Sequence, residues 1–465
     1  MTTGARPAHD HRDPAGSDPR GTAGGPRSGA EGGDRPGTAG GPRSGAGGGD
    51  RPGTAGGPRS GAGGADPRGT GAVAAAWRAA RSSVPPGHLD AAGCNVPSDR
   101  VLDAVVGHLR REREVGGYGA VADLGTARSA LAALVGAHAR DVAFLESGTA
   151  AMAALLGGWR LAPGSRVGHT RAEYGSTLML LRRLAAERGV RPVEVPVDGD
   201  SRVDLDALRE VLAGGLDLLT VPHIASHRGV VQPAREIGRL CREAGVPLVL
   251  DVCQSLGHVD TGGIGAAAYV GTSRKWLAGP RGVGFLITPG LAGPDREPDR
   301  LGRVMDAAAP SLGGHFWVGG QPSPLTGAAR YESAEASMAA RSGLGVAVLE
   351  HRALGPAALH ARLAELGVTA RRLLDGAGGW RAGEPLGEPS AVVTLRPPPG
   401  ADPVAAVEEA GARAAAASLL VGTVPVARAP LDLAAPVLRV SPAPGACEES
   451  LHALARILAG RPLSA

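Results

Sequence analysis

The chain has 465 residues and a formal net charge of +4. So small a charge for this length gives no reason to expect nucleic acid or another polyanion as a partner. The sequence has no run of about 18 apolar residues, the length that a membrane span needs, and no apolar secretory segment at its start. We expect a cytoplasmic protein without disulfides or a metal site, because its four cysteines lack CxxC spacing: Cys94, Cys241, Cys253 and Cys447.

A low-complexity segment forms the first 72 residues. The string Gly-Thr-Ala-Gly-Gly-Pro-Arg-Ser-Gly-Ala begins at Gly21 and returns at Gly37 and Gly53. Alanine supplies nearly all of its apolar side chains, so the segment cannot bury a core and we expect it to be disordered. Acidic and basic residues nearly balance there. A solubilising or neutral extension is therefore favoured over a nucleic-acid-binding arm.

Strand-like and helix-like segments alternate through the middle of the chain. Short apolar runs predict strands, and apolar residues at helical spacing predict helices. In chain order we expect a strand at 141–145 with a helix to about 157, a strand at 190–197, a helix at 203–213, a strand at 216–224, a helix at 233–244, and strands at 246–250, 266–270 and 283–287. Repeated strand–helix units predict an α/β fold with a mainly parallel sheet covered by helices on both faces.

The pattern changes after residue 342. One long helix at 343–366 is expected to lead into strands near 391–395 and 437–441. We therefore predict three parts: the tail at 1–72, an N-terminal segment with a large α/β domain at 73–342, and a small C-terminal α+β domain at 343–465. Residues 88–119 are expected to pack against the small domain or to line the site.

Lys275 is the only lysine in the chain, and all the other residues counted with it as Lys or Arg are arginine. Arginine can replace lysine as a charge or a hydrogen-bond donor. It cannot form a Schiff base, which needs a primary amine that loses its proton. Lys275 also stands just before a Gly-Pro turn at 279–280. We interpret this lysine as functional, against the alternative of a surface lysine that survived by chance.

Two further features fall at the carboxyl ends of predicted strands, where ligands bind in open α/β sheets. Gly148, Thr149 and Ala150 open a helix whose free N–H groups suit a phosphate. Asp251 ends an apolar strand, where a carboxylate needs a cationic partner. Each feature alone is common in proteins that bind nothing. Together with Lys275, 24 residues after Asp251, they predict a pyridoxal phosphate site in which the carboxylate pairs with the protonated ring nitrogen.

The residues around this site resemble the class-V aminotransferase family of fold-type I, which includes cysteine desulfurases and kynureninase. The motifs are Asp251-x-x-Gln254 and Ser273-Arg274-Lys275, followed by Leu277-x-Gly279-Pro280-x-Gly282-x-Gly284. The resemblance implies that Gln254 contacts the phenolic oxygen of the cofactor. It also implies that Ser273 and the next residue bind its phosphate, although desulfurases usually have His where this chain has Arg274.

The same resemblance assigns three positions outside these motifs. It implies that Tyr174 stacks on the cofactor ring and that Arg439 binds the α-carboxylate of the substrate. Ser226 stands where the family often has asparagine. Members of the fold usually form homodimers with shared sites, which implies that the glycine-rich residues 311–314 reach the phosphate of the partner.

Longer strings resemble one branch of the family, the hercynylcysteine S-oxide lyases of ergothioneine biosynthesis, from about residue 85 to the C-terminus. They lie at 114–118, 173–175, 225–229, 254–258, 273–284, 428–431 and 439–442. The implied reaction is a β-elimination on a cysteine-derived sulfoxide, with Lys275 removing the α-proton. A desulfurase would need a nucleophilic cysteine well after Lys275, and the next one is Cys447, which we expect at a helix start.

The far end of such a substrate carries a trimethylammonium group and a second carboxylate. A quaternary ammonium favours an aromatic face, and the few aromatic candidates are Tyr118, Phe316, Trp317 and Tyr331. Ordinary packing is the alternative for each. Arg228 and Arg330 are candidates for the second carboxylate. Two other functions stay open at this point: another reaction of the family (aminotransferase, kynureninase-like hydrolase or cysteine lyase), and a binding module without catalysis.

Overall fold

The structure is a computed structural model that describes residues 69–84, 87–291 and 305–462. The predicted disorder of residues 1–68 lies outside these ranges. Helix α1 begins at Thr70, so the last residues assigned to the tail are helical. The predicted division into three parts stays a prediction.

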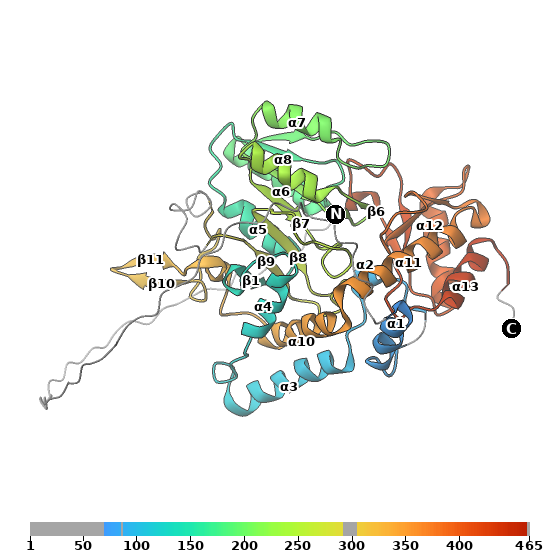
Figure 1. The fold of residues 1–465 in the computed structure, drawn as a ribbon, viewed down its shortest axis with the longest axis horizontal. Coiled ribbons are helices and arrows are strands. Elements are labelled where there is room, and N and C mark those ends of the chain that lie inside the picture. The colour runs from blue at the N-terminus through green and yellow to red at the C-terminus, as the bar shows by residue number, and fades with distance from the viewer. Residues whose placement is uncertain (1–68, 85–86, 292–304, 463–465) are drawn as a thin grey trace, which may run out of the picture. The chain divides into compact units, whose positions relative to one another are not determined.

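A seven-stranded sheet forms the centre of the fold, in the order β1-β9-β8-β7-β4-β2-β3 (Figure 1). Neighbours among β2, β3, β4, β7 and β8 pair in parallel, whereas β9 runs antiparallel to both β1 and β8. This confirms the predicted, mainly parallel sheet. The strands are β1 (Val142–Leu145), β2 (Arg166–His169), β3 (Arg191–Glu194), β4 (Leu218–Pro222), β7 (Leu248–Asp251), β8 (Ala268–Thr272) and β9 (Gly284–Ile287).

Helices cover both faces of this sheet because its strands are apolar on both faces. Successive side chains of a strand point to opposite sides, so Leu248 and Leu250 join one apolar cluster while Val249 joins the other. The first cluster takes side chains from α4 (Gly125–Ala133), α7 (Leu205–Ala213), α8 (Ala234–Glu243) and α10 (Met338–Leu354), and the second from α5 (Gly148–Gly158) and α6 (Gly175–Arg188). Helix α3 (Asp99–Val115) packs on α10.

The prediction of a single helix at 343–366 is wrong. The structure has α10, ending at Leu354, and α11 (Pro356–Leu374), with Gly355 between them at φ 85°. Proline has no N–H to continue a helical ladder and disfavours the helical conformation in the residue before it. Helix α10 begins before residue 343 and therefore crosses the predicted domain boundary.

A second, antiparallel sheet lies in the C-terminal part, in the order β12-β13-β15-β14. Its two central strands match the strands predicted near 391–395 and 437–441. Leu395 and Leu438 of these strands are buried in one cluster with Ala410 and Leu454 of neighbouring helices. The elements are β12 (Arg381–Ala382), β13 (Val393–Arg396), α12 (Pro403–Ala416), β14 (Gly422–Val424), β15 (Val437–Val440) and α13 (Glu448–Leu458).

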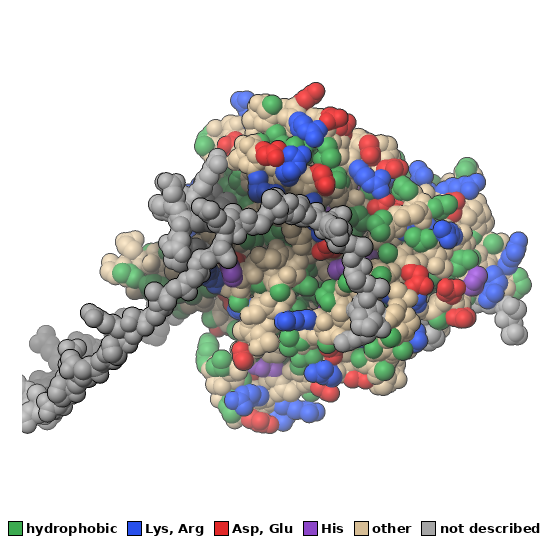
Figure 2. Space-filling view, in the orientation of Figure 1, with side chains coloured by type: hydrophobic (Ala, Val, Ile, Leu, Met, Phe, Trp, Pro, Cys, Tyr) green, Lys and Arg blue, Asp and Glu red, His purple; other side chains and the backbone are tan. Residues whose placement is uncertain are grey.

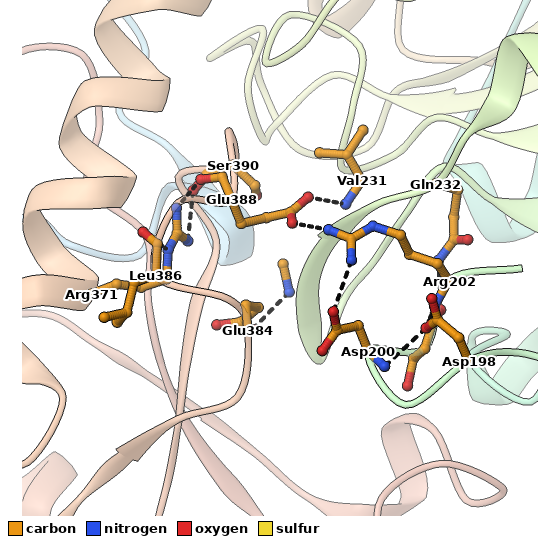
Figure 3. A network of polar contacts seen from close by, with 12 residues as sticks. Asp198, Asp200, Arg202, Val231, Gln232, Arg371, Glu384, Leu386, Glu388 and Ser390 are labelled. Carbon is orange, nitrogen blue, oxygen red and sulfur yellow. Dashed lines mark hydrogen bonds and ion pairs between the residues drawn. The ribbon is translucent and has the colours of Figure 1, made fainter.

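A buried polar network joins the second sheet region to the hairpin of β5 (Ile224–Ala225) and β6 (Arg228–Val231) (Figure 3). Two alternate N–H groups of β6 donate to Glu384 and Glu388, each at 2.8 Å. Glu388 also pairs with Arg202, while Arg371, fully buried, donates to backbone carbonyls of the same loop. The two carboxylates thus satisfy strand N–H groups that no neighbouring strand reaches.

The remaining elements are short. They are α2 (Ala91–Cys94), η1 (Ala139–Asp141), β10 (His315–Val318), β11 (Gln321–Pro324), η2 (Gly327–Tyr331), η3 (Ala377–Gly379) and η4 (Val426–Arg428). Acidic and basic side chains are interspersed over the face shown in Figure 2. Among the helices of the described ranges, none combines the length and the apolar character that crossing a bilayer requires.

Candidate active site

A pocket opens at the carboxyl ends of the parallel strands, where the sequence places its chemistry-bearing residues. Its walls come from the first turns of α5 and α6, from the ends of β4, β7 and β8, and from η4. The lining residues are Ser147, Gly148, Thr149, Met152, Ala172, Tyr174, Ser176, Thr177, Pro222, Ile224, Ser226, Asp251, Cys253, Gln254, Thr272, Arg274, Lys275 and Arg428. Eight of the thirteen predicted site residues are among them.

Lys275 follows β8 and is buried, with 9% of its surface exposed. Burial lowers the pKa of its ammonium group to about 8. The side chain forms no hydrogen bond or ion pair with any residue in the described ranges, so its amine faces the pocket. The chain turns directly after it, with Ala278 at φ 53°, a conformation that is uncommon for a residue other than glycine. The result is an amine that gives up its proton readily.

Asp251 ends β7, and its Oδ1 accepts a hydrogen bond from the N–H of Cys253 at 2.8 Å. No Lys, Arg or His of the described chain lies within ion-pair distance of this carboxylate, so the expected cationic partner is not a side chain. Glu173 lies nearby and is fully buried, and burial together with Asp251 raises its pKa to about 8. At neutral pH Glu173 is therefore mainly protonated and adds little negative charge beside Asp251.

The start of α5 offers free N–H groups to the pocket. The first N–H groups of a helix have no partner within it, and Gly148 and Thr149 both line the pocket. The N–H of Ala150 instead donates to the capping hydroxyl of Ser147 at 3.0 Å. A Cβ on Gly148 would lie 2.6 Å from Cys253 Sγ, so this close packing requires glycine. The arrangement leaves two donors for one anionic group.

The two residues before Lys275 differ in their position relative to the pocket. Ser273 is fully buried, does not line the pocket, and has a hydroxyl without a hydrogen-bond partner among the described residues. Arg274 lines the pocket and donates to the carbonyl oxygen of Gly93. Residues 90–95 thus lie against the site, as the sequence indicates for the segment that contains them.

The amide of Gln254 has a fixed orientation. Trp276 Nε1, which can only donate, lies 2.9 Å from Gln254 Oε1. Gln254 Nε2 donates to the carbonyl oxygen of Ala92 at 3.0 Å. His258 stacks on Trp276 with ring centroids 3.8 Å apart. One hydrogen of Nε2 is left, so Gln254 can donate to an acceptor in the pocket.

The substrate side of the pocket is basic. Tyr174 lines it, and the guanidinium of Arg428 lies 5.6 Å from the centroid of the Tyr174 ring. Arg439 lies behind Ser226: it donates to the carbonyl oxygen of Ser226 at 2.9 Å and pairs with Asp90 Oδ1 at 2.9 Å. Arg439 is 4% exposed and does not line the pocket. The Ser226 hydroxyl is buried without a partner among the described residues.

The other predicted substrate contacts lie away from this pocket. Arg228 is 3.6 Å from Asp432 and lines a second cavity. Tyr118 is 89% exposed and donates to Glu335 at 3.1 Å. Phe316 and Trp317 are exposed on β10, Tyr331 is buried, and Arg330 donates to the carbonyl oxygen of Gly327 at 3.2 Å.

Four residues near the site escaped sequence reasoning: Asp90, Glu173, Cys253 and Arg428. Glu173 and Cys253 stand directly beside predicted site residues, so adjacency could have indicated them. Burial raises the pKa of the Cys253 thiol well above its usual value, so this cysteine is not a thiolate. Asp90 comes from a distant part of the chain and had no local signal. Arg428 stands in the string at 428–431, but nothing in that string indicated that its side chain reaches the pocket.

Comparison with known proteins assigns the chain to a family. The sequence profile of class-V aminotransferases matches residues 90–305. A probable hercynylcysteine sulfoxide lyase of Mycobacterium tuberculosis (strain CDC 1551 / Oshkosh) is 41% identical over 389 residues, which cover 82% of this chain and 92% of the relative. The chain belongs to the class-V aminotransferase family. The family resemblance of the sequence is thereby confirmed.

More distant relatives of this class-V aminotransferase family member include cysteine desulfurases. A probable cysteine desulfurase of Methanothermobacter thermautotrophicus is 30% identical over 46% of this chain and 56% of its own length. Among solved structures, the apo cysteine desulfurase from Thermococcus onnurineus NA1 has a TM-score of 0.70 at 18% identity, covering 80% of this chain and 94% of its own. The cystine C–S lyase C-DES, in complex with its product cysteine persulfide, has a TM-score of 0.68 at 19% identity, covering 82% and 99%.

These likenesses show the fold-type I architecture, and the family's cofactor is pyridoxal 5'-phosphate. The pocket fits that cofactor on three observations. Among the described residues, the Lys275 amine has no partner, the Asp251 carboxylate has no cation, and two N–H groups at the start of α5 are free. We therefore describe the protein as a pyridoxal phosphate enzyme.

Proposed function

We propose that the enzyme is a carbon–sulfur β-lyase that cleaves hercynylcysteine S-oxide in ergothioneine biosynthesis. The observation that carries the proposal is the 41% identity over 92% of the M. tuberculosis relative, which is described as a lyase for this substrate. The overall change would convert the sulfoxide and water into a sulfenic acid, pyruvate and ammonia. No oxidant or reductant enters this balance.

The cofactor, when bound, supplies an aldehyde for covalent attachment of amines and a ring that accepts the electron pair left at the α carbon. Lys275 would hold it, and Asp251 would hold its ring nitrogen. Gln254 would donate to its phenolic oxygen, and Tyr174 would cover one face of the ring. Gly148 and Thr149 would bind the phosphate.

The remaining phosphate and substrate contacts belong to other residues. Ala150, Ser273 and Arg274 stay proposals as phosphate contacts. Arg439 would bind the α-carboxylate, with Asp90 as its counter-ion in the absence of substrate. The carbonyl of Ser226 already fixes the guanidinium for that role.

Lys275 has a second role in this proposal. With substrate bound, the Nζ of Lys275 would be the free amine that takes the α-proton. A pKa of about 8 leaves a substantial fraction of this amine neutral at physiological pH. Removal of that proton places an electron pair at the α carbon, and the Cβ–S bond breaks as a sulfenate leaves. A sulfenate is a far better leaving group than a thiolate, so the step needs no enzyme thiol.

A cysteine desulfurase is the second candidate, because cysteine desulfurases are among the relatives in sequence and structure. That reaction uses a cysteine as nucleophile, and a nucleophilic cysteine must be a thiolate. The sequence has none between Lys275 and Cys447, and Cys447 caps the start of α13. The pocket contains Cys253, whose thiol is held protonated by burial. These features favour the lyase.

The test is to mix the purified holoenzyme with hercynylcysteine S-oxide and to follow pyruvate with a coupled dehydrogenase. We expect stoichiometric pyruvate and ammonia, with ergothioneine appearing when a thiol reductant is present. Lys275→Ala should abolish turnover. Amino transfer to a keto acid without pyruvate, or alanine and persulfide from cysteine, would contradict the proposal.

We also propose a homodimer in a reducing cytoplasmic compartment. All four cysteines lie in the described ranges and are unpaired. Hairpin β10–β11 projects from the body of the fold (Figure 1) and exposes Phe316, Trp317 and Val318 by 49%, 67% and 56%. Contiguous exposed apolar side chains of this kind favour an interface. Sedimentation analysis of the holoenzyme would test it.

A further inference from the structure

We propose that Arg428 is the residue that reads the second carboxylate of the substrate, so that the enzyme selects cysteine S-oxides carrying a carboxylate on the sulfur substituent. The inference rests on the proposed function and deepens it. It concerns the half of the substrate that lies beyond the reacting Cβ–S bond.

Three arginines lie in or beside the pocket, a fourth lines the second cavity, and two of the four have acidic partners. Arg439 pairs with Asp90 at 2.9 Å, and Arg228 lies 3.6 Å from Asp432. Arg274 lines the pocket but already donates to the backbone carbonyl of Gly93. Arg428 lines the pocket and has no carboxylate within ion-pair distance in the described part of the chain. It is therefore the cation on the substrate side that is left for an incoming anion.

The position of Arg428 is fixed by close packing. It ends η4, whose backbone packs against the first turn of α6. A Cβ on Gly175 would collide with the carbonyl oxygen of Ala427, so only glycine allows this approach. The Arg428 guanidinium donates to the Tyr174 hydroxyl at 3.4 Å and lies over its ring. The hydrogen bond to the Tyr174 hydroxyl is long and therefore weak, so a charged ligand can replace it while the guanidinium stays over the ring.

The positive charge of the site also leaves one guanidinium for an anion besides the phosphate and the α-carboxylate. Burial lowers the pKa of Arg439, and the neighbouring Arg428 and Arg274 guanidinium groups lower it further, so the three cations lie close enough to repel one another. Asp90 offsets one of them, and Asp251 faces the lysine side of the pocket. A cysteine conjugate with a single carboxylate would use Arg439 and leave Arg428 unpaired. A dicarboxylate would pair with both, and a guanidinium binds a carboxylate through two parallel hydrogen bonds.

The experiment compares two substrates on the holoenzyme. Hercynylcysteine S-oxide carries the second carboxylate, and S-methylcysteine S-oxide lacks it. We expect Arg428→Met to raise KM for the first by about tenfold or more, since charge-assisted hydrogen bonds of this kind are strong. The kcat/KM for the second should stay within about twofold. Arg428→Lys should recover part of the loss, because it keeps the charge without the fork.

Binding without turnover gives an independent readout. Hercynine, the trimethylated histidine alone, carries the second carboxylate but no cysteine half. Calorimetry should show its Kd rising about tenfold in Arg428→Met. The same change at Arg396, an exposed arginine on the second cavity, is the matched control and should leave the Kd unchanged.

The outcomes separate this inference from the proposed function. Equal losses on both sulfoxides, or an unchanged hercynine Kd in Arg428→Met, would overturn the role of Arg428 alone. If wild-type enzyme released no pyruvate from hercynylcysteine S-oxide, the proposed function would fail and the inference would fail with it. A selective loss on the hercynyl substrate, with weaker hercynine binding, is the result that we predict.

Discussion

At the scale of single residues, the orientation of the Gln254 amide depends on the residue that follows the lysine. An indole N–H can only donate, so Trp276 places the oxygen of Gln254 toward itself and the nitrogen toward Ala92 and the pocket. Neither contact is visible in the Asp-x-x-Gln motif. The chain therefore holds its phenolic-oxygen donor through a side chain 22 residues away.

Replacing Trp276 with phenylalanine tests this positioning. The change keeps an aromatic ring for His258 to stack on but removes the donor, so the amide is held only by its contact with Ala92. We predict a cofactor Kd about fivefold weaker, the equivalent of one ordinary hydrogen bond of about 1 kcal/mol. The pH titration of the bound cofactor's visible absorption should also shift. Trp77→Phe, outside the pocket, is the control, and identical behaviour of the two variants would rule out the role.

The sequence predicted the parts of the site that have a local signature. A helix start after a strand, a strand-terminal Asp251 and a lone Lys275 each reflect chemistry that a short segment reveals. The pairing of Asp90 with Arg439 joins residues 349 apart in the chain. The exposure of Arg428 to the pocket depends on η4 packing against α6. Such contacts arise from tertiary packing, and no motif could show them.

At the scale of elements, the hairpin that carries Ser226 is held by two buried carboxylates. Glu384 and Glu388 accept N–H groups of β6, and a Cβ on Gly229 would collide with the carbonyl oxygen of Val392 (Figure 3). Sequence patterns predicted neither strand β6 nor this clamp, since isolated glutamates in a loop look like surface residues. The break between α10 and α11 was also missed, although Gly355-Pro356 marks it.

Glu388→Ala should destabilise the protein strongly. It leaves the buried Val231 N–H without its acceptor, while the partly exposed Arg202 keeps Asp200, and an unsatisfied buried polar group costs about 2–3 kcal/mol. Urea unfolding of the holoenzyme, followed by circular dichroism, measures the change. Glu365→Ala breaks an exposed pair with Arg362 and should cost at most about 1 kcal/mol. Equal costs for the two variants would contradict a structural role for the clamp.

At the scale of the whole molecule, buried histidines make the fold sensitive to acid. Burial lowers the pKa of His258 to about 3 and those of His223, His351 and His360 to about 4. Histidines in an unfolded chain take up protons near pH 6.5. The stability that comes from keeping them neutral is therefore complete above pH 6.5 and is lost as the pH falls toward 4.

The unfolding free energy should accordingly decrease between pH 6.5 and pH 4. Glu173, with a pKa raised to about 8, and Glu384, whose pKa is also raised by burial, act in the opposite direction as the pH falls, but two carboxyl groups are set against four histidines. Urea unfolding at several pH values measures the slope. His351→Leu removes one of the four titrating groups and should therefore flatten the slope. Leucine suits this position because neither ring nitrogen has a hydrogen-bond partner among the described residues. A slope unchanged in this variant would show that His351 does not contribute.

The central claim, that one amine in this pocket holds the cofactor, is tested most directly by reductive trapping. Borohydride fixes the cofactor to the amine that carries it, and Lys275 is the only lysine in the chain. Digestion and mass spectrometry should locate the label on one internal peptide containing Lys275, and Lys275→Arg should carry none. Label on the N-terminal amine, or no label in wild-type enzyme with bound cofactor, would contradict the claim.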